Sequence, residues 1–190
     1  MNTMGQSLKE ALLSSFENLQ VDHPEETRVI VNCRKDSLHA VLNYLKNSGY
    51  DHLALISCVD RIKKNELELV YILTAYTEDK KQSKMNILVK TNISRDKPEF
   101  QTIINLFENA EPYERELHEL YGIHFEGHPR QTPLLLERKY EIPPFRKDFD
   151  TRKYVQQVFD EVPFVEAKAK AEAKKDEERV KTDLIINLRR

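Results

Sequence analysis

The chain has 190 residues, of which 33% are charged and 39% hydrophobic, and its formal net charge is -2. This length suits one domain with a core and an appendage, and the small net charge gives no general attraction to nucleic acid or anionic membranes. The 4 glycines form no GxGxxG or GxxxxGK[ST] motif, which argues against a phosphate-binding loop.

Cysteine content and hydropathy argue against a metal-cluster protein, a membrane-spanning protein and a secreted protein. Cys33 and Cys58 are the only cysteines and lie in separate apolar runs. A structural zinc site or an iron–sulfur cluster needs four ligands, so we expect two buried, reduced thiols. No run approaches the roughly 20 apolar residues that cross a bilayer, and the N-terminus lacks the apolar core of a signal peptide. We expect a soluble intracellular protein that meets a membrane only through partners.

Hydrophobic periodicity predicts helices and strands in alternation over the first half of the chain. In chain order we expect a helix around residues 8–16 that ends before Pro24, a strand over 28–33, a helix over 38–45 that stops at Ser48 and Gly49, and strands over 52–59, 66–76 and 85–90. The short turns between the last three strands favour antiparallel pairing.

Two further helices are expected in the second half. The first begins at Pro98 and buries Phe100, Ile103, Ile104 and Phe107. The second opens at Glu114, after Pro112, and ends at Gly122, where glycine adopts a positive φ without strain. Ile123 and Phe125 then alternate with polar residues, as in a strand.

These elements predict an α+β fold in two layers, a small and mostly antiparallel sheet with helices on one face. We expect three parts: an α+β core domain over 1–127, an extended segment over 128–165 that binds a partner, and a charged tail over 166–190 that is helical or disordered. A short helical turn is indicated by Tyr154, Val155, Val158 and Phe159. The apolar residues 184–188 suggest an anchor for another subunit, or a segment that packs back on the domain.

The histidines near residue 120 do not form a metal motif. His118 and Glu119 begin an HExx sequence, but position 122, where the second histidine belongs, is glycine. That glycine also ends the helix that would present both ligands. We therefore expect no metal at His118, His124 or His128.

The carboxylates of Glu114, Glu116 and Glu119 surround Arg115. Residues at i and i+2 point to different sides of a helix, so Glu114 and Glu116 do not form a catalytic dyad. Two interpretations remain open: ion pairs that fix this corner, or a solvated helix start whose acids the helix dipole favours. Further on, Phe145 and Phe149 flank three charged residues, a pattern that suits rings inserted into a neighbouring protein with charges at the rim.

Two motifs together resemble a known family. The sequence YERELHELYGIHFEGHP over 113–129 and PPFRKDF over 143–149 are similar to the signature of the 30-kDa (NuoC-type, or C) subunit of respiratory complex I. That family includes the equivalent subunit of membrane-bound NiFe hydrogenases and related ferredoxin-driven complexes. The resemblance spans about 28–149.

The resemblance implies a non-catalytic scaffold subunit in the peripheral arm of a membrane-bound, ion-translocating respiratory complex. It implies packing against the large catalytic subunit (49-kDa or NiFe-large-like), iron–sulfur subunits nearby and antiporter-like membrane subunits as indirect partners. The chain is expected to bind no cofactor itself, with iron–sulfur clusters and a NiFe or quinone site in partner subunits. Its expected place is the cytoplasmic face of the cell membrane.

The residues expected to form or support the partner interface share these two motifs. They are Tyr113, Glu114, Arg115, Glu116, Gly122, Phe125, Gly127, His128, Pro129, Phe145, Arg146, Lys147, Asp148 and Phe149. Two alternatives stay open. One is a free-standing enzyme that uses Glu114, Glu116 or His128 as acid or base, and the other is an adaptor that binds through the tail alone.

Overall fold

The computed structural model describes residues 4–77, 79, 82, 84–138 and 140–158. The chain divides into two compact units, Met1–Phe149 and Asp150–Arg190, which are described separately. The first unit thus takes in part of the segment that the sequence sets apart from residue 128 onward. Phe159, the charged tail and the apolar residues 184–188 lie outside the described residues. Within the described ranges, no helix is both long and apolar enough to span a bilayer.

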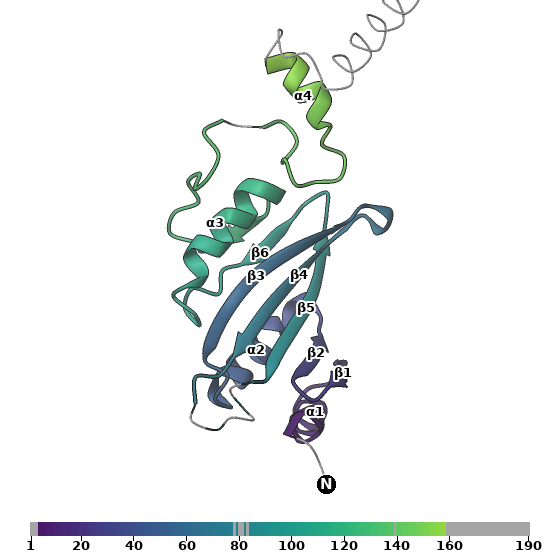
Figure 1. The fold of residues 1–190 in the computed structure, drawn as a ribbon, viewed down its shortest axis with the longest axis vertical. Helices are drawn as coiled ribbons and strands as arrows, with labels where there is room; N and C mark the ends of the chain where they lie inside the picture. The colour runs from purple at the N-terminus through teal and green to yellow at the C-terminus, as the bar shows by residue number, and fades with distance from the viewer. Residues whose placement is uncertain (1–3, 78, 80–81, 83, 139, 159–190) are drawn as a thin grey trace, which may run out of the picture. The chain divides into compact units, whose positions relative to one another are not determined.

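The first unit is built on a five-stranded sheet (Figure 1). Its elements are α1 (Met4–Ser15), β1 (Gln20–Glu25), β2 (Arg28–Asn32), η1 (Lys35–Ser37), α2 (Leu38–Asn47), β3 (His52–Arg61), η2 (Ile62–Lys64), β4 (Glu66–Thr74), β5 (Asn86–Ser94), β6 (Glu99–Gln101), α3 (Ala110–Tyr121) and β7 (His124–Glu126). The strand order is β1-β2-β5-β4-β3. All neighbours are antiparallel except β2 and β5, so the predicted α+β fold with a mostly antiparallel sheet is confirmed.

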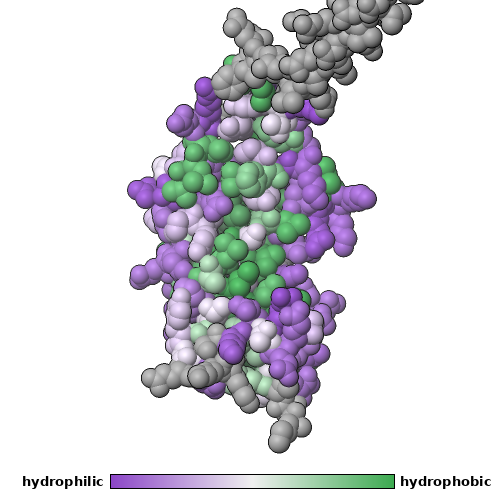
Figure 2. Space-filling view, viewed as in Figure 1, coloured by the Kyte–Doolittle hydropathy of each residue, from purple (hydrophilic) through white to green (hydrophobic). Residues whose placement is uncertain are grey.

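The core lies between one face of the sheet and its helices. Alternate residues of the central strands are fully buried, among them Val29, Ile87 and Leu69. The leucine and valine residues of α2 are fully buried as well. Figure 1 shows α2 behind β4 and β5. On the opposite face, hydrophobic side chains gather over β4 and β5 (Figure 2), where Ile72 and Leu88 pair across the strands.

Strand β1 is absent from the sequence-based prediction, in which Pro24 serves only to end a helix. β1 is an edge strand, and its register with β2 shifts between Asp22 and Glu25. Proline has no amide hydrogen to donate, and an edge strand with an irregularity is where a sheet tolerates it.

The helix expected from Pro98 is wrong. Residues Glu99–Gln101 form β6, which pairs in parallel with β7 and places Phe100 opposite Phe125. The Thr102 amide then donates to the Glu126 carbonyl, and Ile103 and Phe107 are buried through turns. Pairing with a strand more than 20 residues later therefore overrides the local helical pattern.

Helix α3 begins four residues earlier than predicted, at Ala110. Pro112 falls inside its first turn, where the missing amide hydrogen would have no intrahelical acceptor. The end of the helix is as expected, because Gly122 has φ 73° in the left-handed region.

The second unit contains α4 (Thr151–Val158), so the predicted helical turn is present as far as Val158. The carboxylate of Asp150 accepts hydrogen bonds from the Arg152 and Lys153 amides, at 3.0 and 3.1 Å. This side chain caps the helix.

A test of the α1–β1 packing uses Gly5, which allows α1 to cross β1 at close range. A Cβ atom at Gly5 would lie 1.8 Å from Nε2 of His23. We expect Gly5→Ala to lower the melting temperature, although alanine favours a helix over glycine by about 1 kcal/mol. In a His23→Ala background the same substitution should raise it, because the clash is gone. Equal stabilisation by Gly5→Ala in both backgrounds, measured by thermal denaturation, would contradict this packing.

Candidate functional site

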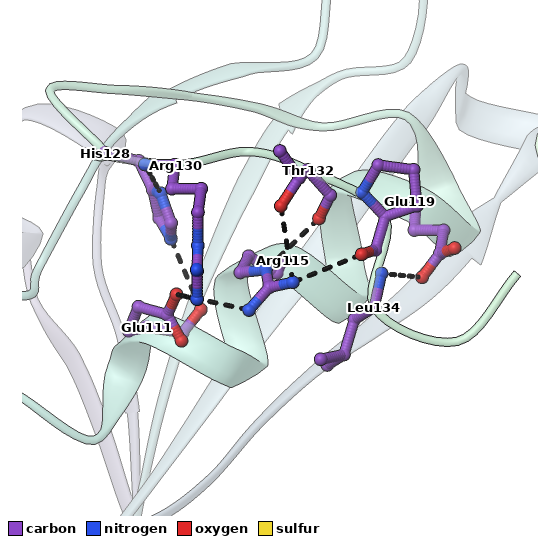
Figure 3. A network of polar contacts seen from close by, with 8 residues as sticks. Glu111, Arg115, Glu119, His128, Arg130, Thr132 and Leu134 are labelled. Carbon is purple, nitrogen blue, oxygen red and sulfur yellow. Dashed lines mark hydrogen bonds and ion pairs between the residues drawn. The ribbon is translucent and has the colours of Figure 1, made fainter.

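One side of α3 carries a row of charged residues. Glu111, Arg115 and Glu119 are spaced four apart, so their side chains lie along one side of the helix. Figure 3 shows all three turned toward the extended chain that follows β7. The row binds that chain at successive points.

Arg115 is nearly buried and binds the backbone of the extended chain. Its Nε and Nη2 atoms donate to the carbonyls of Thr132 and Pro133, each at 3.1 Å, and Nη2 also reaches the Thr132 hydroxyl at 3.4 Å. Nη1 pairs with Glu111 at 3.3 Å. The planar guanidinium has enough donors to satisfy all of these acceptors from one position.

Glu119 accepts three consecutive backbone hydrogen bonds. Its oxygens lie 3.0, 2.8 and 2.5 Å from the amide nitrogens of Leu134, Leu135 and Leu136. Partial burial alone would raise the pKa of Glu119, but these three hydrogen bonds, together with the nearby Arg115 charge, lower it. The carboxylate therefore holds this short turn as an ion.

His128 ties the first part of the extended chain to the start of α3. Its Nδ1 accepts from the Arg130 amide at 3.0 Å, so Nε2 carries the proton and donates to the Glu111 carbonyl at 3.2 Å. Gln131 closes the free edge of β7, because its side-chain amide exchanges two hydrogen bonds with the backbone of Phe125. Both residues hold the chain that leaves the sheet.

Glu114 lies on another side of α3 and is fully buried. Its two oxygens accept from the Thr102 hydroxyl at 2.6 Å and the Ile103 amide at 2.7 Å. Burial raises the pKa of Glu114 to about 7, although both hydrogen bonds act to lower it. This carboxyl fixes the turn after β6 and is neither a solvated helix start nor exposed to a partner.

A second contact region involves residues 143–149, here called the strap. The Phe145 amide donates to the Leu120 carbonyl at 3.1 Å, and Nε of Arg146 donates to the Tyr121 carbonyl at 2.7 Å. A Cβ atom at Gly122 would lie 2.9 Å from the ring of Pro143. The strap thus caps the C-terminal end of α3.

The strap also binds an ion pair at the far ends of β3 and β5. Asp60 and Arg95 pair at 2.9 Å and are both buried. The Lys147 amide donates to Asp60 at 2.8 Å, and Asp148 pairs with Arg95 at 2.5 Å. Burial acts to raise the pKa of Asp60, but the hydrogen bonds from Arg95 and Lys147 prevail and lower it.

The expected interface residues mostly have partners inside the chain. Of the 14, the solvent-exposed ones are Gly127, Pro129, Phe145, Lys147 and Asp148. Tyr113 donates to the Ala54 carbonyl at 3.0 Å, Glu116 is half-buried, and the ring of Phe149 lies 5.7 Å from that of Tyr140. Direct contact of these residues with another protein stays a prediction.

Sequence reasoning leaves Glu111, Asp60 and Arg95 out of this site, and it considers Glu119 only as a member of the carboxylate cluster around Arg115. The four-residue spacing from Glu111 to Glu119 is a usable signal, because it places charges on one side of a helix. Asp60 and Arg95 belong to different parts of the sheet, and nothing in the local sequence joins them to the strap. No group of three or more His, Cys, Asp or Glu residues within the described ranges is placed to hold a metal ion.

Four apolar side chains of the extended chain remain exposed, and the backbone amides of Leu134, Leu135 and Phe145 among them are hydrogen-bonded within the chain. They are Leu134, Leu135, Ile142 and Phe145, at 41%, 61%, 40% and 57% exposure. Backbone polar groups at residues 132–136 and at Phe145 and Lys147 are bound by α3, by the helix end and by Asp60, and these apolar side chains stay in solvent. Such an arrangement presents an apolar surface of defined shape.

We expect Glu119→Gln to free the turn over residues 134–136. The glutamine NH2 group would face amide donors in place of an acceptor, at a cost of about 1–3 kcal/mol. Amide hydrogen exchange should rise there and stay unchanged at β3–β5. Unchanged exchange at these three amides would show that Glu119 does not hold the turn.

Glu114 should make stability depend on pH. A pKa raised from 4.5 to about 7 means that the folded state favours the protonated form, so its stabilisation is full below pH 4.5 and is lost as pH rises through 7. Relative to Glu114→Gln, the wild-type unfolding free energy should fall by on the order of 3 kcal/mol between pH 4.5 and 8. Parallel pH profiles of the two proteins in urea denaturation would contradict this assignment.

Comparison with known proteins gives the site a context. Residues 31–155 match the family described as "Respiratory-chain NADH dehydrogenase, 30 Kd subunit". The C subunit of the F(420)H(2) dehydrogenase of Methanosarcina mazei is 34% identical over 150 residues, 78% of this chain and 90% of that protein. The C subunit of the NADH-quinone oxidoreductase of Moorella thermoacetica is 33% identical over 135 residues, 70% and 87% of the two chains.

Solved structures agree. A chain of the membrane-bound sulfane sulfur reductase (MBS), an archaeal respiratory membrane complex, matches with a TM-score of 0.75 and 28% identity, covering 84% of this chain and 93% of that one. The trypsin-resistant fragment (1-134) of Nqo5 shares the fold, with a TM-score of 0.56 and 22% identity over 67% of this chain and 98% of the fragment. Members of the matching family are subunits of larger assemblies and not standalone enzymes, so the alternative of a free-standing acid–base enzyme is wrong. The chain therefore belongs to the family of the 30-kDa subunit of respiratory-chain NADH dehydrogenase.

Proposed function

We propose that this chain is a scaffold subunit in the peripheral arm of a membrane-bound, ion-translocating respiratory complex. It packs against the large catalytic subunit, of the 49-kDa or NiFe-large type, and supports electron transfer by holding neighbouring iron–sulfur subunits in place. The observation that carries this proposal is the extended chain after β7, whose backbone is held at residues 132–136 and 145–147 by internal polar contacts while apolar side chains of the same chain stay exposed.

The fixed backbone favours protein–protein contact. A segment whose backbone is already ordered does not pay the entropy cost of ordering that backbone on binding, so more of the burial energy of its apolar side chains appears as affinity. Each buried leucine or phenylalanine contributes about 1.5–3 kcal/mol when it leaves water. Leu135 and Phe145 are the most exposed of the four and are the expected centres of the contact.

The relatives support a role that does not depend on one substrate. They belong to complexes named for different substrates: F420H2, NADH with quinone, and sulfane sulfur. Each of these complexes contains a chain similar to this one. A part shared by complexes with different donors and acceptors suits a scaffold. We place the chain on the cytoplasmic face of the membrane, held there by partner subunits, with the redox cofactors in those partners.

The proposal predicts that Leu135→Ser weakens assembly without unfolding the chain. The matched control is Leu13→Ser on α1, which removes a leucine of similar exposure (46% against 61%) at a distant place. The tagged chain is purified from gently solubilised membranes of its native cells, and partner subunits are quantified by mass spectrometry. Wild type and Leu13→Ser should recover a large catalytic subunit and iron–sulfur subunits, and Leu135→Ser should recover several-fold less.

Two outcomes would overturn the proposal. One is recovery of the wild-type chain alone as a stable soluble monomer. The other is equal recovery of partners by both variants, which would remove the apolar side chains of the extended segment from the interface. Circular dichroism of each purified variant checks that the fold is unchanged.

A further inference from the structure

We propose that the strap, residues 143–149, is fastened to its own chain before any partner binds, with Asp60 and Arg95 as the positioning residues that fasten it. The consequence for partner binding rests on the proposed function above. The fastening itself does not, because it concerns contacts within one chain.

The buried carboxylate of Asp60 is the first reason. Arg95 supplies hydrogen bonds to both of its oxygens, at 2.9 and 3.2 Å, and the Lys147 amide adds a third at 2.8 Å. A buried carboxylate that loses a donor pays a desolvation cost, so the body of the chain favours the closed strap. The strap completes a buried polar site and is not a free arm.

Arg95 is the second reason, because it binds one carboxylate of the strap and one carboxylate of the rest of the first unit. Its Nη2 atom binds Asp60 on one side and Asp148 on the other. The Asp60 side chain is almost inaccessible, while that of Asp148 is 41% exposed. The Asp60–Arg95 pair is thus protected from solvent, and Asp148 is the charge that the strap itself contributes on the solvent side.

The end of α3 is the third reason. The final carbonyls of a helix have no donor within it, and its C-terminal end carries partial negative charge. The strap supplies an amide from Phe145 to Leu120 and a guanidinium from Arg146 to Tyr121. Two separate parts of the body, the helix end and the Asp60–Arg95 pair, therefore hold this short stretch of chain.

These contacts divide the strap into anchors and contact residues. Arg146, Asp148 and the Lys147 backbone bind the rest of the first unit, while the Phe145 ring stays 57% exposed and lies at a steep angle to the Tyr121 ring, 5.8 Å between ring centres. A partner would thus meet a preformed surface at Phe145. The anchor residues act on binding through the position of the strap.

The test measures amide hydrogen exchange of the purified full chain, without partners. Asp148→Asn removes the charge that closes the strap and leaves the Asp60–Arg95 pair. The control, Glu141→Gln, removes a charge from an exposed position just before the strap. We expect Asp148→Asn to accelerate exchange at Lys147 and Phe145 by about tenfold, with no change in β3–β5, and Glu141→Gln to have no effect. Fast exchange at Lys147 in the wild-type chain, or equal exchange in all three proteins, would overturn the proposal.

The second measurement separates anchors from contact residues. Phe145→Ala should keep wild-type exchange at Lys147 and still reduce the recovery of partner subunits, whereas Asp148→Asn should change both. If Phe145→Ala accelerates exchange as much as Asp148→Asn does, the division is wrong. If the wild-type chain recovers no partner at all, the proposed function fails, and the exchange result alone decides whether the strap is fastened.

Discussion

The described fold of the first unit depends on how α3 satisfies polar groups on several sides at once. Arg115 is the central interaction: one nearly buried guanidinium holds two backbone carbonyls of the extended chain and the carboxylate of Glu111. Without it, the chain after β7 would lose its attachment to the helix at Thr132 and Pro133. A twelve-residue helix is marginal by itself in water, so these contacts and the core beneath it stabilise each other.

Glu114, on the buried side of the helix, also satisfies two donors with one side chain. Its carboxyl binds the turn that follows β6 and thereby links the small β6–β7 sheet to α3. Residues that share one short charged motif thus have different physical roles. Glu114 is internal, Arg115 and Glu119 hold backbone, and none of them needs another protein for its hydrogen bonds.

The two family motifs act largely within the chain. Charged residues of the motifs look like interface residues in the sequence, yet Arg115, Glu119, Arg146 and Asp148 hold the extended chain, whose apolar side chains are exposed. A protein that must fit between others benefits from a surface that is ordered in advance, because ordering it during assembly would cost affinity. The charges set the shape, and the exposed leucine and phenylalanine side chains are available for contact.

The sequence by itself determined the α+β class, most helices and strands, the glycine end of α3 and the membership of the family, because periodicity and motif spacing are local properties. It did not determine that Glu99–Gln101 is a strand, since its partner β7 lies more than 20 residues later. Nor did it assign partners to the charges. Arg95 lies 35 residues from Asp60 and 53 from Asp148, and only the tertiary structure brings the three together, where the burial of Asp60 and Arg95 makes the pairing of those two obligatory.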